Sequence, residues 1–240
     1  RPVQAQLSPW QDLGTLDRYR QAVSDGGAYD FSKTNEFMYF TPDRAVKFFT
    51  DKRIVAGRVG KAAIVPRAFP PLLGSRDNFY AYRFVPGRTL YESLTPALFR
   101  KFLNWMETQV WRHDDNPTIS ALCRDFYRDK TRDRLRLYAR KYPDEAPLTQ
   151  VNGHPVPPLN TLLDSLPWDD LCRGVSSFIH GDLQFDNVLW DGHDFVLLDW
   201  RQDFAGCVES GDLYYDFGKL LGGIILNYDY VKLGLLTYER

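Results

Sequence analysis

The chain has 240 residues, of which 44% are hydrophobic and 25% are charged, as is ordinary for a globular protein with a buried core. Its 30 basic and 31 acidic residues leave a net charge of −1, so the charge balance does not favour nucleic acid or an anionic membrane as a partner. No apolar run has the length of a membrane span, so we expect no membrane insertion. Three widely spaced cysteines, Cys123, Cys172 and Cys207, indicate reduced thiols and a cytoplasmic protein.

The first predicted elements are a helix and a strand hairpin. Residues 1–27 favour a helix that ends at a pair of glycines. Two strand-forming runs, Phe37–Phe40 and Ala45–Phe49, flank a Pro-Asp turn and predict an antiparallel hairpin. Lys47 lies within the second run. On the strand pattern alone, a solvent-facing lysine and a functional lysine are equally compatible with this position.

A short helix and a third strand follow the hairpin. Asp51–Ala63 read as a helix, and residues 66–74 read as a proline-rich connector. Asn78–Val85 form a long aromatic strand that Pro86 and Gly87 bring to an end.

From Pro96 onward the hydrophobic periodicity is helical. It predicts helices over 97–112, 115–142 and 159–166, with a loop over 143–158. The arginines between Arg124 and Arg140 alternate with acidic residues, and we interpret them as a solvent-exposed face.

A second hairpin carries three oxygen-bearing side chains. Its strands, Val188–Trp190 and Phe195–Leu198, flank a turn that opens with Asp-Gly. Antiparallel pairing brings Asn187 and Asp199 to the same end of this hairpin, and Asp182 lies in the loop that enters that end. Such groups hold hard cations such as magnesium. By itself the ion site suits a hydrolase, a nuclease or a structural ion.

The segment after the hairpin divides into two kinds of charged residue. Gly211–Leu221 predicts a further helix, and acids at its start, Asp212 and Asp216, are explained by the unpaired N–H groups and dipole of a helix N-terminus. Arg201 and Asp203 follow Asp199 directly and have no such explanation, so they are the better candidates for contact with a substrate.

The motif His180-x-Asp182-x-x-x-x-Asn187, followed by an apolar strand that ends in Asp199, resembles the catalytic core of the aminoglycoside phosphotransferases and choline/ethanolamine kinases. These are small-molecule relatives of the protein kinases, which share the spacing but have Phe-Gly where this chain has Trp-Arg. The resemblance covers about residues 30–230, with its specific motifs in 178–220. It implies an α+β, two-lobed protein-kinase-like fold, with a small antiparallel-sheet lobe and a mainly helical lobe.

The resemblance also implies a reaction, the magnesium-dependent transfer of the γ-phosphate of ATP to a hydroxyl group. Asp182 would be the catalytic base, and Asn187 and Asp199 would hold the Mg²⁺. Lys47 would bind the α- and β-phosphates of the nucleotide. The helix that should offer a glutamate to this lysine contains none, so either another carboxylate pairs with it or the pair is dispensable.

Further contacts follow from the same resemblance. Ser32 and Thr34 would cover the phosphates, and the hinge segment with Phe84 and Val85 would meet the adenine. The predicted substrate-binding residues are Trp200, Arg201 and Asp203.

Three readings of the function remain. The wording of the motifs looks most like the branch associated with capsule and surface-polysaccharide biosynthesis, which favours a sugar or a related precursor as the acceptor. A choline/ethanolamine-type kinase is an alternative, because Trp200, Tyr214 and Tyr215 could form an aromatic cage. The third reading, from a different class, is a catalytically silent kinase-like domain that binds a nucleotide or a partner.

We divide the chain into an N-terminal helical segment (1–27), a small nucleotide-binding lobe (28–86) and a helical catalytic and substrate lobe (87–240). Because the chain starts with Arg1 rather than methionine, we expect it to be a piece of a longer protein. Family members often continue with further helices, which leaves a truncation of the substrate lobe open.

Overall fold

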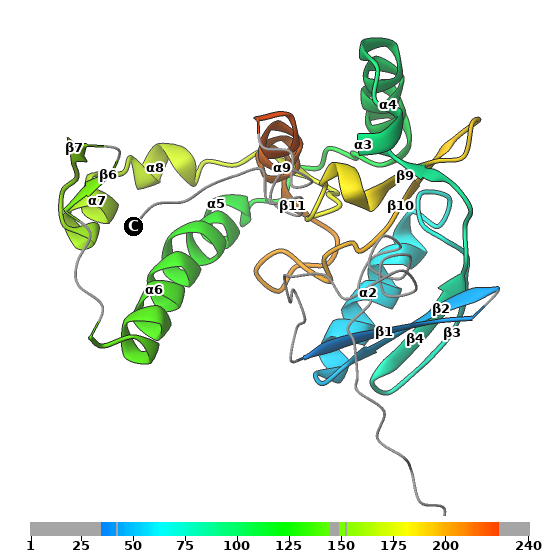
Figure 1. Ribbon diagram of the computed structural model, residues 1–240, viewed down its shortest axis with the longest axis horizontal. Helices are drawn as coiled ribbons and strands as arrows, with labels where there is room; N and C mark the ends of the chain where they lie inside the picture. Colours follow the sequence, from blue (N-terminus) through cyan, green and yellow to red (C-terminus); the bar gives the residue numbers. More distant parts are fainter. Residues whose placement is uncertain (1–34, 42, 145–148, 152, 226–240) are drawn as a thin grey trace, which may run out of the picture.

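The computed structural model describes residues 35–41, 43–144, 149–151 and 153–225 (Figure 1). The helix predicted within residues 1–27 lies outside the described residues, as do Ser32 and Thr34.

The first part of the described chain is a four-stranded antiparallel sheet with one helix against it. The strands pair in the order β1-β2-β4-β3, and they are β1 (Glu36–Phe40), β2 (Arg44–Phe49), β3 (Leu72–Arg76) and β4 (Phe79–Arg83). Helix α2 (Lys52–Ile64) contacts β2, β3 and β4. The predicted hairpin is confirmed as β1 and β2, in which Met38 pairs with Lys47.

Alternation along β2 decides which way Lys47 faces. Ala45, Lys47 and Phe49 are the buried residues of this strand, and its other three residues are half-buried or exposed. Side chains two residues apart lie on the same face of a sheet, so Lys47 lies on the inner face together with Ala45 and Phe49. Its side chain is only 1% exposed. The strand pattern had left a solvent-facing lysine open, and the structure excludes it.

Helix α2 is unusual because its buried face contains two cations. The Asp51 carboxylate caps the helix by accepting the Arg53 N–H at 2.9 Å. Val55, Arg58 and Lys61 then follow at intervals of three residues, all buried. A buried ammonium or guanidinium group loses its hydration, so such groups need compensating contacts. The helix therefore turns charge, as well as apolar surface, toward the rest of the chain.

The second part is mainly helical and contains only short strands. Its helices are α3 (Leu90–Ser93), α4 (Pro96–Gln109), α5 (Ile119–Cys123), a π-helical turn (Arg124–Asp129), α6 (Lys130–Lys141), α7 (Leu159–Ser165), α8 (Trp168–Leu171), a 3₁₀ turn (Phe185–Asn187) and α9 (Leu213–Ile225). A three-stranded sheet joins β5 (Arg88–Thr89) to the predicted hairpin, which is confirmed as β9 (Val188–Trp190) and β10 (Phe195–Leu197). Two further pairs are β8 (Ser176–Ser177) with β11 (Gly211–Asp212), and β6 (Gln150–Val151) with β7 (His154–Pro155).

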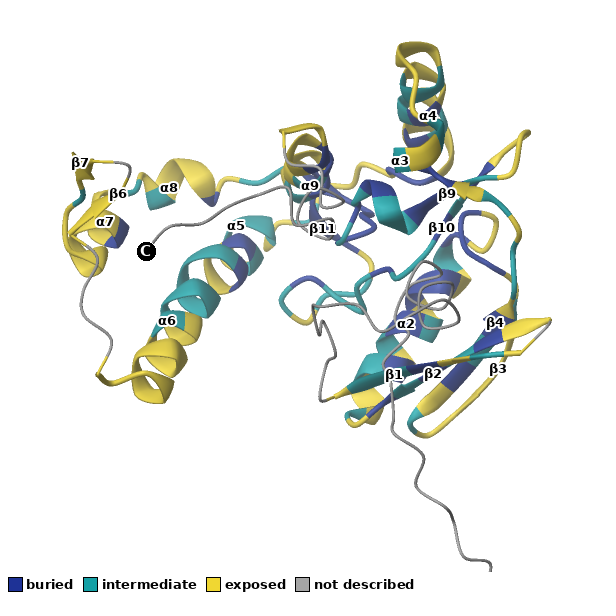
Figure 2. Cartoon of the chain, in the orientation of Figure 1, coloured by how far each residue is buried: buried dark blue, intermediate teal, exposed yellow. Residues whose placement is uncertain are grey.

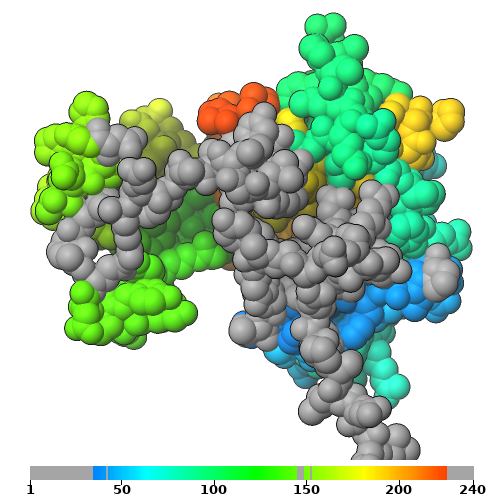
Figure 3. Space-filling model, viewed as in Figure 1, coloured from blue at the N-terminus to red at the C-terminus, as the bar shows by residue number. Residues whose placement is uncertain are grey.

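The arrangement is the predicted α+β fold with two lobes and a protein-kinase-like plan. In the space-filling view, the blue strands of the small sheet lie at the lower right, and the green helical segments around α6 and α7 lie at the left (Figure 3). Helices α6 and α7 are mainly exposed, whereas buried residues gather around α2, β9 and β10 (Figure 2). The chain passes from the first sheet to the second between Arg83 and Arg88, the segment in which we predict the lobe boundary.

Two regions differ from the sequence-based prediction. The predicted connector 66–74 ends in a strand, because β3 begins at Leu72. The single helix predicted over 115–142 starts only at Ile119. Before it, the Asp114 carboxylate accepts the Asn116 N–H, and the Asn116 side chain accepts the Thr118 N–H. These side-chain acceptors compete with helical hydrogen bonding and hold the backbone in turns.

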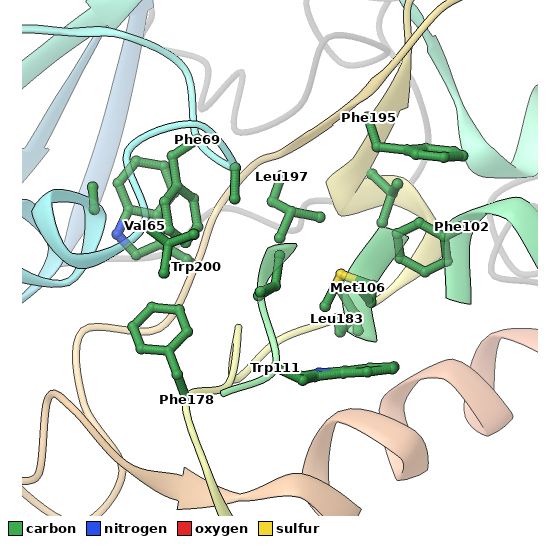
Figure 4. Packing of buried hydrophobic residues seen from close by; sticks show 14 of the residues in the cluster. Val65, Phe69, Phe102, Met106, Trp111, Phe178, Leu183, Phe195, Leu197 and Trp200 are labelled. Atoms are coloured by element: carbon green, nitrogen blue, oxygen red, sulfur yellow. The ribbon is translucent and has the colours of Figure 1, made fainter. Parts of the chain in front are cut away.

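One hydrophobic cluster contains residues of both lobes. It includes Phe49 and Tyr80 from the small sheet and Leu183 and Leu197 from the second part. Trp200 lies at the junction and is 0% exposed, with its ring centroid 4.5 Å from that of Phe69 (Figure 4). Its indole N–H donates to the Arg58 carbonyl oxygen at 2.8 Å. The prediction that Trp200 touches substrate is therefore wrong, because its surface is used up by packing between the lobes.

Two further predictions concern the chain as a whole. All three cysteines are free thiols, two of them buried. Among the described residues, no helix combines the length and the apolar character that a membrane span requires.

The buried Lys61 predicts an unusual dependence of stability on pH. Burial lowers the pKa of this lysine from 10.5 to about 8, although the Asp216 carboxylate partly offsets the shift. Protonated Lys61 therefore costs folding free energy below pH 8. Between pH 8 and 10.5 the unfolded chain binds more protons than the folded protein, so this cost disappears as the pH rises. Lys61→Met should raise the free energy of unfolding by roughly 3 kcal/mol at pH 7 and by only about 1 kcal/mol at pH 10.

Urea unfolding at both pH values measures this difference, and Lys52→Met, an exposed lysine of the same helix, is the matched control. An equal effect of Lys61→Met at both pH values would contradict the prediction.

Candidate active site

The loop before β9 places Asp182 and Asn187 together. The Asn187 side-chain amide donates to the Asp182 backbone carbonyl oxygen at 2.8 Å. This bond holds the two residues close together although they are five positions apart in the sequence. The Asn187 carbonyl oxygen in turn accepts the Leu198 N–H at 2.8 Å, so Asn187 lies beside the residue that precedes Asp199. The hairpin thus brings Asn187 and Asp199 to one end, with Asp182 in the entering loop, as the sequence predicts.

His180 joins this loop to the end of the hairpin. Its Nδ1 accepts the Asp182 N–H at 3.2 Å, and its Nε2 lies 2.8 Å from the Leu198 carbonyl oxygen. These two bonds require a neutral ring with the proton on Nε2. Burial lowers the pKa of His180, which also favours the neutral form. The ring therefore braces the loop by hydrogen bonding.

The buried carboxylate of Asp216 also holds this loop in place. One of its oxygens accepts the His180 N–H at 2.8 Å and the Trp111 indole N–H at 3.1 Å, and the other accepts the Gly181 N–H at 2.8 Å. Gly181 has φ +85, and a Cβ there would lie 2.8 Å from the Arg201 Cβ. Only glycine fits this turn. Asp216 thus has a structural role, but it stabilises the loop that carries Asp182 rather than the start of its own helix.

Asp212 stabilises both the start of its own helix and residues that are distant in the sequence. Its carboxylate accepts the Tyr214 N–H at 3.2 Å, close to the start of α9, as the sequence predicts. It also accepts the Val175 N–H at 2.8 Å and the Tyr127 hydroxyl at 2.6 Å.

Lys47 reaches Asp199 across the junction between the lobes. The lysine Nζ lies 2.7 Å from Asp199 Oδ1 and 3.2 Å from Glu36 Oε1. Burial is the largest single effect on Lys47 and opposes its charged form, but the Asp199 carboxylate together with the Tyr80 and Tyr82 hydroxyls raises the pKa overall, so the ammonium persists. Asp199 itself has φ +53, a strained conformation for a residue with a side chain. Glu36, on the neighbouring strand, supplies the carboxylate that the helix lacks.

Helix α2 contributes Arg58, which pairs with Asp199; it contributes no acid that would pair with Lys47. The Arg58 guanidinium forms an ion pair with Asp199 Oδ1, lies 4.7 Å above the ring of Phe49, and reaches the Tyr80 hydroxyl at 3.4 Å. Burial opposes its charge, but Asp199, Tyr80 and Glu36 together outweigh the burial, so the pKa of Arg58 is raised. Two cations and two carboxylates therefore form a compact, buried cluster at the base of the hairpin.

A pocket of about 680 Å³, within the size range of small-molecule sites, lies next to the loop that carries Asp182, although Asp182 itself is not among its lining residues. Lys219 lines it, and the lysine Nζ is 3.0 Å from the Asp182 carboxylate. Arg201 also lines it, with its Nε donating to the Gly181 carbonyl oxygen at 3.0 Å. Asp203 is not among the lining residues, and its carboxylate accepts the Gly206 N–H at 3.1 Å. Of the predicted substrate residues, Arg201 alone contributes to this pocket.

The predicted hinge residues lie at the end of β4. The Phe84 N–H donates to the Asp43 carbonyl oxygen at 2.9 Å, so it is already bonded within the small lobe. The ring of Phe84 packs edge-on against Phe40, at 6.4 Å between centroids. Val85 is half-buried.

The donor set at the hairpin fits magnesium. This ion takes oxygen ligands, commonly one or two side chains together with the phosphates of a substrate. Asp199 supplies a carboxylate and Asn187 an amide oxygen, from opposite strands of one hairpin. In the part of the chain that the structure describes, no three His, Cys, Asp or Glu side chains group as an ion site made of protein alone.

A sequence model of the phosphotransferase enzyme family matches residues 53–232, which is well over half of the chain. The chain belongs to this family. The predicted resemblance is thereby confirmed at the level of the family. The search of curated proteins finds no match to the chain.

Solved structures similar to this phosphotransferase include the streptomycin–ATP complex of APH(2″)-IIa, whose sequence is 12% identical. The superposition covers 94% of this chain and 86% of the APH(2″)-IIa chain, with a TM-score of 0.48. The GDP complex of aminoglycoside 2′-phosphotransferase-IIIa is 16% identical, with a coverage of 80% and 70% and a TM-score of 0.45. A choline/ethanolamine kinase family protein from Mesorhizobium loti is 14% identical, with 87% and 69% covered and a TM-score of 0.44.

Glu36, Arg58 and Lys219 are the site residues of this phosphotransferase that sequence reasoning missed. For Glu36 a partial signal was available, because it directly precedes the predicted strand Phe37–Phe40; in the structure it lies diagonally across from Lys47 on the same face of the hairpin. Arg58 contacts Asp199, which lies 141 positions later in the chain, and Lys219 contacts Asp182, which lies 37 positions earlier. No local sequence pattern predicts contacts over such separations.

The Arg58–Asp199 pair predicts a coupling that a double-mutant cycle can measure. Removing the guanidinium breaks a charged hydrogen bond and leaves Asp199 with Lys47 alone. Arg58→Gln should therefore lower the free energy of unfolding by about 2 to 3 kcal/mol. Arg53→Gln, which removes an exposed arginine of the same helix, should change it by less than about 0.5 kcal/mol.

The cycle with Asp199→Asn isolates the pair. A coupling energy within about 0.5 kcal/mol of zero would show that Arg58 and Asp199 act independently.

Proposed function

We propose that this protein transfers the γ-phosphate of ATP to a hydroxyl group of a small molecule, with Mg²⁺ as the cofactor. The observation that carries the proposal is the position of Asp182 between two distinct sites. On one side, Asp199 joins Lys47 of the small lobe at 2.7 Å, where a triphosphate would need cations. On the other side, Lys219 connects Asp182 to a pocket large enough for an acceptor.

Asp182 acts on the acceptor. Its carboxylate orients the hydroxyl and accepts the proton as the hydroxyl oxygen bonds to the γ-phosphorus. The bond between the γ-phosphorus and the bridging oxygen breaks at the same time, and ADP leaves. Because the transition state of such transfers is loose, positioning contributes more than activation of the nucleophile. The bonds from Asp216 and His180 to the loop provide that positioning.

The other residues act on the phosphates. Lys47 binds the α- and β-phosphates, and Asn187 and Asp199 hold the magnesium ion. When bound, the ion neutralises charge on the transferring group. Phe84 and Val85 line the adenine site. Ser32 and Thr34, outside the described residues, cover the phosphates in this proposal. The proposed function also includes a cytoplasmic location for the protein.

The acceptor that we favour is a sugar or another surface-polysaccharide precursor. Arg201 at the pocket supports this choice, because guanidinium groups bond to hydroxyl and acidic oxygens. A choline-type acceptor has weaker support. Tyr214 and Tyr215 line the pocket as a cage would require, but Trp200 is buried elsewhere.

Nucleotide binding is tested by thermal stabilisation. A ligand that binds only the folded state at 100 times its Kd stabilises it by about 2.7 kcal/mol. MgATP should therefore raise the melting temperature, and Lys47→Met should greatly reduce the shift. Lys52→Met is the control, since this lysine is exposed on the neighbouring helix. No shift with the unmodified chain would refute the kinase assignment.

Catalysis is tested by Asp182→Asn. The amide keeps the shape of the side chain but cannot accept the proton, so the turnover of ATP with an accepted hydroxyl compound should fall by a factor of about 10² to 10⁴. The MgATP-induced thermal shift should persist. Asp77→Asn, in the turn between β3 and β4, is the isosteric control. Unchanged turnover in Asp182→Asn would rule out the base, whereas nucleotide binding without any turnover would favour the silent domain.

A further inference from the structure

The pocket beside Asp182 is strongly cationic. Four basic residues line it, and they are Lys130, Arg134, Arg201 and Lys219. Asp212 is the one acid among the described residues that line it, and its carboxylate is buried under three hydrogen-bond donors. Lys219 is balanced by Asp182. The remaining three cations give the pocket an excess of positive charge.

Lys130 shows most clearly that this charge lacks a partner. Its Nζ lies 4.2 Å from the ring centroid of Phe126, and no described carboxylate pairs with it. The side chain is half-buried, and burial together with the nearby charges of Arg201 and Arg134 lowers its pKa to about 8, against a smaller opposing effect of the Asp203 carboxylate. The cations thus outweigh the one acid that acts on Lys130, and a bound anion would relieve the repulsion between them.

Neighbouring basic residues on the same stretch of helix behave differently. Arg128, Arg132 and Arg136 do not line the pocket, and each has an aspartate within 2.8 Å. Among the described residues Lys130 and Arg134 form no such ion pair, although aspartates are frequent in this part of the chain. The predicted alternation of basic and acidic residues therefore describes the paired arginines, whereas the half-buried Lys130 and the exposed Arg134 line the pocket.

The π-helical turn explains how the pocket receives adjacent side chains. It ends at Asp129, directly before Lys130. Phe126 stacks on Phe204 at 4.3 Å between centroids, and the next residue, Tyr127, also faces inward and bonds to Asp212. Turns of this kind add a residue to the helical repeat and are frequent at functional sites. Aromatic faces and cations thus line one wall together.

We propose that the acceptor is an anion, a hydroxylated small molecule whose carboxylate or phosphate binds Lys130 and Arg134 while its reacting hydroxyl faces Asp182. The proposal rests on the proposed function and narrows its substrate to acidic sugars and sugar phosphates or compounds of the same chemistry. The aromatic side chains Tyr127 and Tyr215 would pack against the apolar face of the ring. A positively charged acceptor such as choline would be repelled by the same cations.

The test measures binding to the full chain saturated with ADP and Mg²⁺. Glucose, glucose 1-phosphate, glucuronate, glucosamine and choline are titrated calorimetrically at low and high salt. At least one anion should bind about tenfold or more tightly than glucose, because a charge-assisted hydrogen bond contributes that much. Its affinity should fall with salt, and the two cations should bind more weakly than glucose. The ranking of glucuronate and glucose 1-phosphate separates a carboxylate site from a phosphate site.

Variants then assign the effect to the pocket. Lys130→Met should weaken the tighter anion about tenfold, and Lys130→Glu should shift the preference toward glucosamine. Lys141→Met, at the far end of α6 and outside the pocket, should leave the anion affinity unchanged. If both anions bind no better than glucose, or if Lys130→Met leaves their affinity intact, the inference is overturned. If ADP itself fails to bind, it is the proposed function that fails.

Discussion

The two lobes of this phosphotransferase meet at one carboxylate. Asp199 receives Lys47 from the small sheet and Arg58 from the helix behind it, and Glu36 balances the second positive charge. A buried ion pair is weak evidence for stability, because desolvation consumes most of the attraction. In this protein the ion pairs matter because they fix the positions of side chains, not because they add stability. The cluster fixes Lys47 relative to the hairpin, and every role proposed for Asp182 and Asn187 depends on this relative position.

The hairpins could be predicted from the sequence because their rules are local. Two short apolar runs and an Asp-Gly turn define β9 and β10, and Gly192 has φ +100, the conformation that such a turn requires. The position of Lys47 on the buried face needed the structure, since a strand has two faces and its pattern does not say which one is covered. Trp200 failed for the converse reason: an aromatic residue next to a predicted ligand suggested a binding contact, but its large apolar surface is buried between the lobes.

Contacts between distant segments set the limit of the prediction. The acid Asp216 was expected to stabilise its own helix, yet it binds N–H groups of a loop 35 and 36 residues earlier. The arginines of the stretch 124–140 were interpreted as one exposed face because they alternate with acidic residues. Lys130 and Arg134 lie one turn apart on α6 and line the pocket, whereas Arg132 and Arg136 lie on another face of the same helix and pair with aspartates.

The bond from the Trp200 indole to the Arg58 carbonyl has a mechanical consequence. Together with the Arg58–Asp199 ion pair, it fastens α2 to the second lobe by backbone and side chain at the same residue. Helix α2 follows the small sheet in sequence but is tied to the opposite lobe. A rigid-body closure over the nucleotide would then carry α2 with the hairpin, and the sheet would swing against it about the short segments that flank the helix.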